Sequence, residues 1–523
     1  MKRATEFLTA LLVAGSFLAC DKDPVGEQDN ASQLTLSPDS VVVRLSQSST
    51  LNVAVRNASG VIQQYVPITY VSRDPGIASV NATGTISGMT VGSTYVVATV
   101  TSRPDVRDSI RVRVYTDPPQ EIPLSGAAVP GMESYDQLIS DFMRKYSIPG
   151  GAVAVLRDGK LIYARGFGYA DVANKTVVQP DALFRIASVS KPITSAAIMT
   201  LVEEGKLELD DRMAPFVAHL APAPGATVDP RWDDITIRQL LNHTGGWDRG
   251  KPNGGFDPMD RPIIAANAVG APVPATAETI IRYMKGMPLD FNPGEKHVYS
   301  NFGYAILGRV IERVTGMRYE EYVRSRVLLP AGASRTRSGK TRLADAFADE
   351  VKYYQPGQPG LGLTAPLVPS VFPGEGMAPI PYGAFHMESF DASGAWVSST
   401  VDLLRFLTAV DGRANRPDIL SAATVAQMTS ASNGAQVCAS GACYYAGGWV
   451  VRPTQGDATW SHGGALPGTT SILVRSFHNF SWVALFNARV WTSGFDAELD
   501  AALWSALANS TSFPTHDLFS SFR

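Results

Sequence analysis

The sequence changes character at residues 116–132, a stretch rich in proline and glycine, and this change divides the chain into two parts. Residues 33–115 before it are rich in Val, Ile, Thr and Tyr, alternate apolar with polar side chains, and carry turn residues at short intervals. From residue 133 onward, helical and strand patterns are mixed. A chain of 523 residues is also too long for one compact core. We therefore predict an all-β sandwich, a linker at 116–132, an α+β domain over 133–510 and a C-terminal tail at 511–523.

The N-terminus has the pattern of a secretory signal. Lys2 and Arg3 precede an apolar run over residues 7–19 that is too short for a lasting membrane-spanning helix and ends at Cys20. A small residue followed by cysteine is typical of a lipoprotein cleavage site, so we expect a signal peptide over 1–20, a lipid on Cys20 and a polar tether over 21–32. The alternative is an ordinary signal peptide cut nearby. Either pattern predicts export, and the first predicts a periplasmic or cell-surface lipoprotein held to a bacterial membrane only by its lipid.

The other two of the 3 cysteines are Cys438 and Cys443, which flank a turn-prone Ala-Ser-Gly-Ala spacer. An exported protein enters an oxidising compartment, where such a pair persists as a disulfide. We interpret the pair as a local clip on a hairpin. The alternative of a redox or metal pair lacks the two-residue spacing and a nearby histidine.

The α+β part begins with helix and hairpin signals. Ser134 followed by Gln137 predicts a capping box that opens a helix through about Lys145. Two β-rich runs joined at Asp158-Gly159 predict a hairpin. Strand patterns return near the C-terminal end, after a long stretch of helices and loops. We therefore predict one antiparallel sheet, built from both ends of the domain, with an inserted helical lobe.

The first chemical motif is Ser188-Val-Ser-Lys191, the only Ser-x-x-Lys in the chain. Residues three apart share a helix face, so the Lys191 amine can reach the Ser188 hydroxyl. A serine at a helix N-terminus also has backbone N–H groups that favour developing negative charge. Alone, such a pair occurs by chance in many helices.

A second motif supplies a proton relay. Tyr299-Ser-Asn301 is the only Tyr-x-Asn in the chain. A free tyrosine titrates near 10, so it needs about 4 kcal/mol of help to act as a base near pH 7, and we expect a Lys191 ammonium to supply it. Asn301 offers both a donor and an acceptor, which suits holding a substrate or fixing Lys191.

The third motif is His462-Gly463-Gly464, within a strand pattern. Glycines allow a substrate to approach an edge strand closely, and the backbone N–H of Ala465 can then join that of Ser188 in an oxyanion hole. A competing His-x-Gly at His243 precedes the tyrosine, and we interpret it as a structural loop or part of the cleft rim.

These three motifs, in this order, resemble the serine hydrolase group that holds class C β-lactamases, S12-type D-alanyl-D-alanine peptidases and family VIII carboxylesterases. The resemblance covers about residues 133–510. The run from Ser72 to Gly88 likewise resembles bacterial Ig-like domains of the BIG2 group, whose default role is a spacer or adhesive module. The supporting stretches of the hydrolase group are Leu240-Leu-Asn-His-Thr-Gly-Gly, Phe291-Asn-Pro-Gly, Gly303-Tyr-Ala-Ile-Leu-Gly and Gly394-Ala-Trp-Val.

The resemblance implies that Ser188 is acylated and that Lys191 and Tyr299 form the general-base pair, with Asn301, His462, Gly463 and Gly464 binding substrate and no cofactor or metal. β-Lactamases of the group usually carry Lys where this chain has His462, which is mostly neutral near pH 7. We therefore expect ester or D-amino-acid peptide cleavage rather than efficient β-lactam hydrolysis. The alternative is a non-catalytic protein that binds or senses peptidoglycan or β-lactams. A net charge of −3 offers no basic stripe for nucleic acid, and the Ig-like domain is a candidate for cell-wall or polysaccharide contact.

Overall fold

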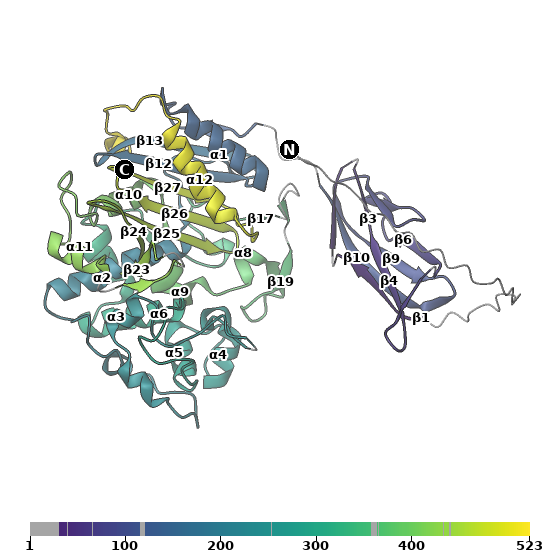
Figure 1. The fold of residues 1–523 in the computed structure, drawn as a ribbon, viewed down its shortest axis with the longest axis horizontal. Coiled ribbons are helices and arrows are strands. Elements are labelled where there is room, and N and C mark those ends of the chain that lie inside the picture. Colours follow the sequence, from purple (N-terminus) through teal and green to yellow (C-terminus); the bar gives the residue numbers. More distant parts are fainter. Residues whose placement is uncertain are drawn as a thin grey trace, which may run out of the picture. The chain divides into compact units, whose positions relative to one another are not determined.

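The computed structural model describes residues 31–522, except for 39, 46, 65, 116–120, 253, 357–362, 365, 432–433 and 439–440. The predicted signal peptide, Cys20 and residues 21–30 of the tether lie outside the described residues. The chain forms two compact units, divided between Thr116 and Asp117 (Figure 1). Each unit has its own hydrophobic core. The prediction of an all-β Ig-like sandwich followed by an α+β domain is confirmed.

The first unit is a sandwich of short, mostly antiparallel sheets in which alternate side chains point into one core. Its larger sheet has the strand order β2-β10-β9-β6, and β10 pairs with β2 in parallel. Ala31 and Ser32, predicted as tether, already belong to the first strand. The strands are β1 (Ala31–Ser37), β2 (Ser40–Arg44), β3 (Ser48–Thr50), β4 (Asn52–Asn57), β5 (Ile62–Gln63), β6 (Ile68–Ser72), β7 (Ala78–Val80), β8 (Thr85–Gly88), β9 (Gly92–Val100) and β10 (Arg103–Tyr115).

The second unit is built on one antiparallel sheet, of ten strands among the described residues, to which both ends of the unit contribute. The strand from the N-terminal side, β12, pairs with β27 from the C-terminal side. The predicted sheet built from both ends is therefore confirmed. Its strands are β11 (Leu124–Ser125), β12 (Gly150–Arg157), β13 (Lys160–Asp171), β14 (Thr176–Val177), β22 (Ala435–Gln436), β23 (Tyr444–Ala446), β24 (Trp449–Pro453), β25 (Ala458–Leu466), β26 (Thr469–Arg475) and β27 (Phe480–Phe486).

The predicted hairpin joins β12 to β13. Asp158 and Gly159 both have positive φ, 50° and 75°, which is the geometry of the tight turns that match strand twist. The strand before the turn, β12, is buried on both faces, because helices cover the sheet on each side.

Helices α1 (Glu133–Tyr146) and α12 (Phe495–Ala508) lie together on one face of the sheet (Figure 1). The capping box predicted for α1 is wrong. Met132 occupies the N-cap, and the Ser134 hydroxyl instead donates to the carbonyl oxygen of Ala506 on α12, at 2.6 Å. A partner distant in sequence thus takes the side chain that the local pattern assigned to a cap.

The opposite face of the sheet carries α2 and α10, and beyond them lies the inserted helical lobe (Figure 1). The helices on this side are α2 (Ser190–Glu203), α3 (Ile237–Leu241), α4 (Pro262–Val269), α5 (Ala277–Lys285), α6 (Asn301–Thr315), α7 (Tyr319–Val323), α8 (Ile380–Gly383), α9 (Met387–Gly394), α10 (Thr400–Thr408) and α11 (Ala422–Met428). Small strands on this side are β15 (Phe184–Arg185), β16 (Arg337–Ser338), β17 (Gln355–Pro356), β18 (Leu363–Thr364), β19 (Leu367–Pro369), β20 (Met377–Pro379) and β21 (Trp396–Ser398).

Two segments that carry no periodic pattern are part of the second unit. Within the predicted linker, Leu124–Ser125 forms edge strand β11 on β13, and two residues are too few to give a periodic signal. The predicted C-terminal tail packs back on the unit, where Arg405 of α10 donates to the carbonyl oxygens of Phe519 and Phe522. Across the described parts of the chain, none of the helices has both the length and the apolar character needed to cross a bilayer.

Candidate active site

Ser188 lies in a short 3-10 helix, Ala187–Val189, which runs directly into α2. The preceding Ala187 has a φ of 46°, a left-handed conformation that costs free energy for a non-glycine residue. Hydrogen bonds hold Ile186 on both sides of its peptide: its N–H donates to Trp396 at 2.9 Å, and its carbonyl accepts from Ser471 at 2.6 Å. The strained turn thereby presents the half-buried Ser188 hydroxyl to a pocket.

Lys191 is fully buried in the first turn of α2, and its amine touches three oxygen atoms. Its Nζ lies 3.2 Å from Ser188 Oγ, 2.7 Å from Asn301 Oδ1 and 2.8 Å from the carbonyl oxygen of Ser393. The amide and carbonyl oxygens can only accept hydrogen bonds. They therefore take two of the N–H bonds of Lys191.

Burial lowers the pKa of the Lys191 amine well below its ordinary value, and the nearby Arg249 guanidinium lowers it further, while the Asp257 carboxylate raises it. A neutral amine has two N–H bonds and one lone pair. With both N–H bonds taken by Asn301 and Ser393, the lone pair faces the Ser188 hydroxyl. This arrangement suits proton transfer from the serine to the amine.

Tyr299 stands on the other side of the serine, immediately before the N-cap residue of α6. The Lys191 Nζ lies 4.7 Å from the centre of the Tyr299 ring. Burial raises the pKa of the Tyr299 phenol far above its ordinary value, and a hydrogen bond with Ser188 opposes this only in part. These directions differ from the expectation that a Lys191 ammonium lowers the pKa of Tyr299, because the buried amine itself resists charging. These directions favour the amine over the phenol as the base, and the phenol keeps its proton.

His462 lies on β25 and is buried beside Tyr299. Burial, assisted by Lys191, lowers the pKa of its imidazole to about 3, so the ring is neutral near pH 7. Its Nδ1 lies 2.6 Å from the Gly463 carbonyl oxygen, which can only accept, so Nδ1 carries the hydrogen. Nε2 is then the acceptor for the Tyr445 hydroxyl at 3.0 Å. His462 thus supplies shape and polarity to the site without positive charge.

Gly464 explains the glycines of the third motif. A Cβ at this position would collide with Ser471 Oγ and the Ile186 carbonyl oxygen, and would lie 3.0 Å from the Ser188 backbone nitrogen. The edge of β25 therefore approaches the nucleophile turn as closely as a backbone can. Ala465 follows on the same strand and lines the pocket with Gly463 and Gly464.

Sequence reasoning missed a charged pair beside Asn301. The Asn301 Nδ2 donates to Asp257 Oδ2 at 2.7 Å, which fixes the amide so that its oxygen faces Lys191. The Arg249 guanidinium reaches the same carboxylate oxygen at 3.4 Å and stands 5.1 Å from the centre of the Tyr299 ring. Both residues come from the loop over 248–260, which has no periodicity or motif that would single them out.

His243, interpreted from the sequence as a structural or rim loop, lies behind Tyr299. Its ring centre is 4.3 Å from that of Tyr299, and its Nδ1 accepts the backbone N–H of Ser300 at 3.2 Å. Burial lowers the pKa of His243 well below its ordinary value, with Lys191 adding to the shift. The residue therefore supports the tyrosine as a neutral ring and does not face the pocket lining.

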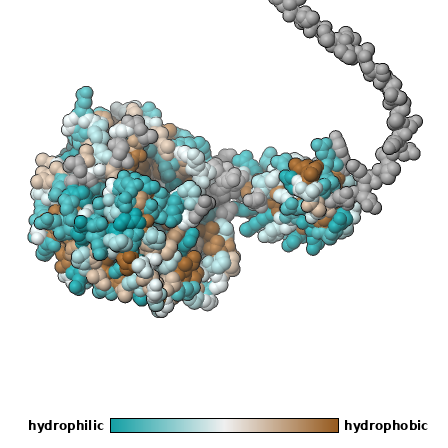
Figure 2. Space-filling model, turned by 60° about the horizontal axis from the view of Figure 1, so that its bottom comes forward, coloured by the Kyte–Doolittle hydropathy of each residue, from teal (hydrophilic) through white to brown (hydrophobic). Residues whose placement is uncertain are grey.

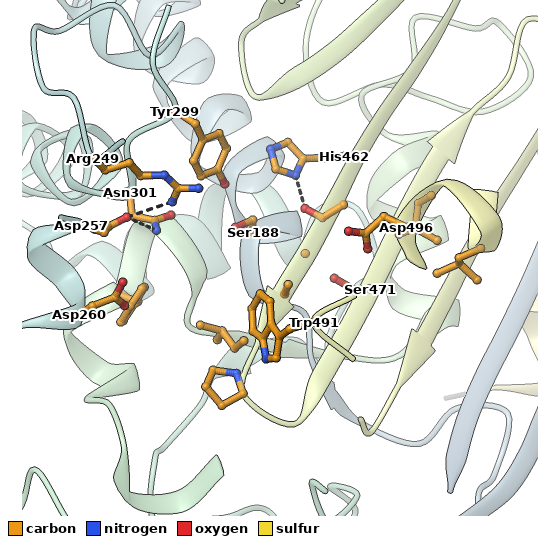
Figure 3. A pocket seen from close by; sticks show the side chains of 18 of the residues that line it. Ser188, Arg249, Asp257, Asp260, Tyr299, Asn301, His462, Ser471, Trp491 and Asp496 are labelled. Atoms are coloured by element: carbon orange, nitrogen blue, oxygen red, sulfur yellow. Dashed lines mark hydrogen bonds and ion pairs between the residues drawn. The ribbon is translucent and has the colours of Figure 1, made fainter. Parts of the chain in front are cut away.

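The pocket has a volume of about 890 Å³ and opens over Ser188 (Figure 3). Arg249, Asp257 and Asp260 lie on one side of it, and Trp491 and Asp496 on the other (Figure 3). Desolvation by the surrounding atoms, and then the Asp257 carboxylate, raise the pKa of Asp260 to about 6, although part of this residue is exposed to solvent. The apolar lining comes from Phe390, Leu466, Pro467, Ile472, Trp491 and Leu499.

The remaining predicted site residues lie elsewhere. Cys438 and Cys443 are joined in a disulfide at the end of the β22–β23 hairpin. Cys20 lies outside the described residues. Within the described ranges, no group of three or more His, Cys, Asp or Glu side chains is arranged to hold a metal ion.

Comparison with known proteins places this site in a family. Residues 135–504 match the family described as Beta-lactamase, which covers most of the chain. The chain belongs to the β-lactamase family. This β-lactamase-family chain is a serine hydrolase, and its residues 31–109 match the bacterial Ig-like domain, group 2.

Among curated relatives, the β-lactamase-family chain is 28% identical to Penicillin-binding protein 4* of Bacillus subtilis (strain 168) over 356 residues, 67% of this chain and 71% of that protein. It is 31% identical over 204 residues to Protein flp of Staphylococcus aureus (strain N315), 39% of this chain but only 38% of that protein. Among solved structures, D-amino acid amidase from Ochrobactrum anthropi SV3 shares the fold with a TM-score of 0.53 and 23% identity, over 73% of this chain and 99% of that one.

Proposed function

We propose that this chain is an exported esterase or amidase that acts through an acyl-enzyme on Ser188. One observation carries the proposal. A buried amine lies 3.2 Å from the hydroxyl of a serine that opens to a pocket, and 2.7 and 2.8 Å from the Asn301 and Ser393 oxygens, so that its neutral form would turn its lone pair to the serine. A neutral amine in contact with an accessible hydroxyl is the arrangement that nucleophilic catalysis requires.

In the acylation step, Ser188 Oγ attacks the substrate carbonyl carbon while its proton passes to Lys191 Nζ. The carbonyl oxygen becomes an oxyanion, for which we assign the backbone N–H groups of Ser188 and Ala465 as donors. The bond to the leaving group then breaks. The Tyr299 phenol gives its proton to the departing amine or alkoxide and regains one from the Lys191 ammonium, which restores the neutral amine.

Deacylation repeats these steps with water as the nucleophile. The water oxygen attacks the acyl carbon, and its proton passes through Tyr299 to Lys191. The oxyanion again lies between the two backbone N–H groups. When the bond to Ser188 Oγ breaks, the serine oxygen takes the proton back, and a carboxylic acid leaves the pocket.

The pocket charges favour neutral or cationic substrates over anionic ones. His462 carries no charge near pH 7, so the cation that usually holds a β-lactam carboxylate is missing. Arg249 is the cation of the pocket, but the Asp257 carboxylate pairs with it, and Asp260 adds a second carboxylate above about pH 6. A relative that shares the fold is a D-amino acid amidase. We therefore propose short-chain esters and D-amino-acid amides as substrates, with β-lactams poor.

The test uses residues 21–523 as wild type, Ser188→Ala and the control Ser195→Ala. Ser195 lies on the same helix, and its buried hydroxyl has no hydrogen-bond partner among the described residues, so its loss should cost little. A fluorophosphonate should add to wild type and the control but not to Ser188→Ala, as read by intact mass. Turnover of p-nitrophenyl butyrate and D-alanine p-nitroanilide should exceed that of nitrocefin.

Two outcomes would contradict the proposal. Properly folded wild type with no adduct and no turnover would favour the binding or sensing alternative. Nitrocefin turnover above that of the ester and the amide would overturn the substrate preference while leaving Ser188 as the nucleophile.

We also propose that the chain is a lipoprotein anchored through Cys20, on the support of its N-terminal sequence alone. Expression of the full chain in a bacterial host with radiolabelled palmitate should label the wild type and not Cys20→Ser. Equal labelling of both, or none of the wild type, would contradict the anchor.

A further inference from the structure

The outer face of the larger sheet in the Ig-like unit carries a row of arginines that form no ion pair with the described residues. β9 lies between β6 and β10 in this sheet (Figure 1). Side chains that alternate with the core positions point outward, and among them are Arg107, Arg111 and Arg113 on β10. Arg73, just after β6, joins them by covering the Tyr95 ring at 5.2 Å. These four arginines define what we call the arginine face.

The strand register sets the layout of the arginine face. Arg111 pairs with Tyr95, and Arg107 pairs with Thr99, so three arginines follow one strand beside a central tyrosine. Arg107 and Arg113 are six residues apart, which places them about 20 Å apart along β10. The face is therefore long enough for several units of a linear polymer.

The described residues offer these arginines no acidic partner on this face. Within the described ranges, the outward positions of β2, β6 and β9, and those of β10 from Arg107 onward, hold no Asp or Glu. Asp105, nearer the start of β10, pairs with Arg103. Asp108 lies between two outward positions but turns to the other side, where its carboxylate accepts the backbone N–H of Leu36 at 2.9 Å. Arg113 Nη1 is buried and has no hydrogen-bond partner in the part of the chain that the structure describes.

Such an arrangement is unfavourable by itself. Arg111 and Arg113 are two residues apart on one strand and repel each other, and the Arg111 charge, after burial, lowers the pKa of Arg113. A ligand with repeated negative charges would relieve this repulsion. Residues 31–115 contain seven arginines and four aspartates, with no lysine or glutamate, whereas the whole chain has a net charge of −3. The positive charge is thus local to the Ig-like unit.

The residue types on the arginine face indicate which chemical class of ligand it can bind. The planar guanidinium of arginine can form two parallel hydrogen bonds with a carboxylate or a similar oxyanion, whereas the ammonium of lysine cannot. Between the arginines, Tyr95 is 42% exposed and Val71 is 57% exposed. A flat ring and small apolar side chains suit the apolar faces of sugar rings. On the side that Figure 2 shows, the surface of the Ig-like unit is mostly hydrophilic, with a small hydrophobic patch.

We propose that the arginine face binds an acidic polysaccharide, with guanidinium groups on the acidic groups of the chain and Tyr95 against a sugar ring. This would place the hydrolase unit beside a cell-envelope glycan. The inference does not depend on the proposed reaction at Ser188.

The test measures binding of polygalacturonate to residues 21–523 carrying Ser188→Ala, so that turnover cannot interfere. Arg111→Gln with Arg113→Gln should raise the Kd at least tenfold, and Tyr95→Ala should raise it several-fold. The matched control is Arg56→Gln with Arg103→Gln, which removes the same charge from the same unit without changing the four arginines of the arginine face and should change the Kd less than twofold. Affinity should fall steeply with added salt, and uncharged dextran should not bind.

Three results would overturn the proposal. The control pair weakening binding as much as the Arg111/Arg113 pair would show a general charge effect. If the folded protein does not bind polygalacturonate, an acidic polysaccharide is ruled out as the ligand of the arginine face. Binding to phosphatidylglycerol vesicles that is stronger than to polygalacturonate, and is lost with the same two arginines, would show that the face binds a membrane surface. Circular dichroism of each variant confirms that it is folded.

Discussion

If Lys191 is the base in its neutral form, two charges near it should shift the acid side of the pH profile in opposite directions. Activity is lost as the pH falls through the pKa of Lys191, because the amine then carries a proton and cannot accept one from Ser188. The Asp257 carboxylate raises that pKa and the Arg249 guanidinium lowers it. Asp257→Asn should therefore move the acid limb of kcat/KM to lower pH, and Arg249→Gln should move it to higher pH.

The structure sets the size of the Asp257 effect. Lys191 Nζ and Asp257 Oδ2 are joined through one amide group and two hydrogen bonds of 2.7 Å each, which places the charges about 7 Å apart. At about 7 Å, two unit charges interact by about 0.6 kcal/mol in water and about 2.4 kcal/mol at an effective dielectric of about 20. Since about 1.4 kcal/mol equals one pKa unit, the limb should move by about 0.4 to 1.7 pH units.

Asparagine is the most informative replacement for Asp257, because its side-chain oxygen can still accept a hydrogen bond from the Asn301 N–H. The geometry around Lys191 is then preserved while the charge is removed. The assay is kcat/KM for p-nitrophenyl butyrate over the acid range, with Asp260→Asn as the companion variant. Asp260 itself titrates at about 6, so this variant removes its titration from the profile without removing the Asp257 charge. Asp257→Asn and Arg249→Gln shifting the limb in the same direction, or neither shifting it, would refute Lys191 as the base.

Three further predictions concern packing. Gly464→Ala should lower kcat/KM at least 100-fold, because its Cβ would collide with Ser471 and Ile186. The control Gly463→Ala should lower kcat/KM far less, because its Cβ meets only the Ser471 carbonyl oxygen at 3.8 Å, and equal losses would contradict the close approach of β25. Arg185→Leu should lower the free energy of unfolding by about 3 to 5 kcal/mol in urea melts, because it leaves the fully buried Glu350 side chain without its cation; a change below about 1 kcal/mol would contradict this. Reduction of the Cys438–Cys443 disulfide should lower the free energy of unfolding by about 2 kcal/mol, because a five-residue separation closes only a small loop. Ester turnover should not fall, and a loss of turnover would show that the disulfide supports the geometry of the active site.

The sequence reveals the reacting groups of this site but not their surroundings. Ser188, Lys191, Tyr299 and Asn301 lie in short motifs whose residue types imply their chemistry, and the structure brings them within contact distance. Asp257 and Arg249 act through positions that a loop without periodicity determines, so no local pattern marks them. The pKa directions depend on burial, which the residue types alone do not report.

The same contrast applies to the fold. The hairpin at Asp158-Gly159 was predictable because the turn type depends on two adjacent residues that tolerate positive φ. The cap at Ser134 was not, because the hydroxyl finds the Ala506 carbonyl on a helix more than 350 residues away. Sequence patterns therefore predict a turn or a cap correctly only where the hydrogen-bond partner lies close by in the sequence.

The pairing of β12 with β27 has a consequence for synthesis. While the nascent chain emerges, the first hairpin waits for a neighbour that the ribosome adds some 300 residues later, and until then the strand that carries His462 has no sheet to join. A product truncated before Phe480 would keep every motif residue but would lack β27, and its active site would not assemble. The Ig-like unit is complete by residue 115 and can fold before the rest of the chain is made.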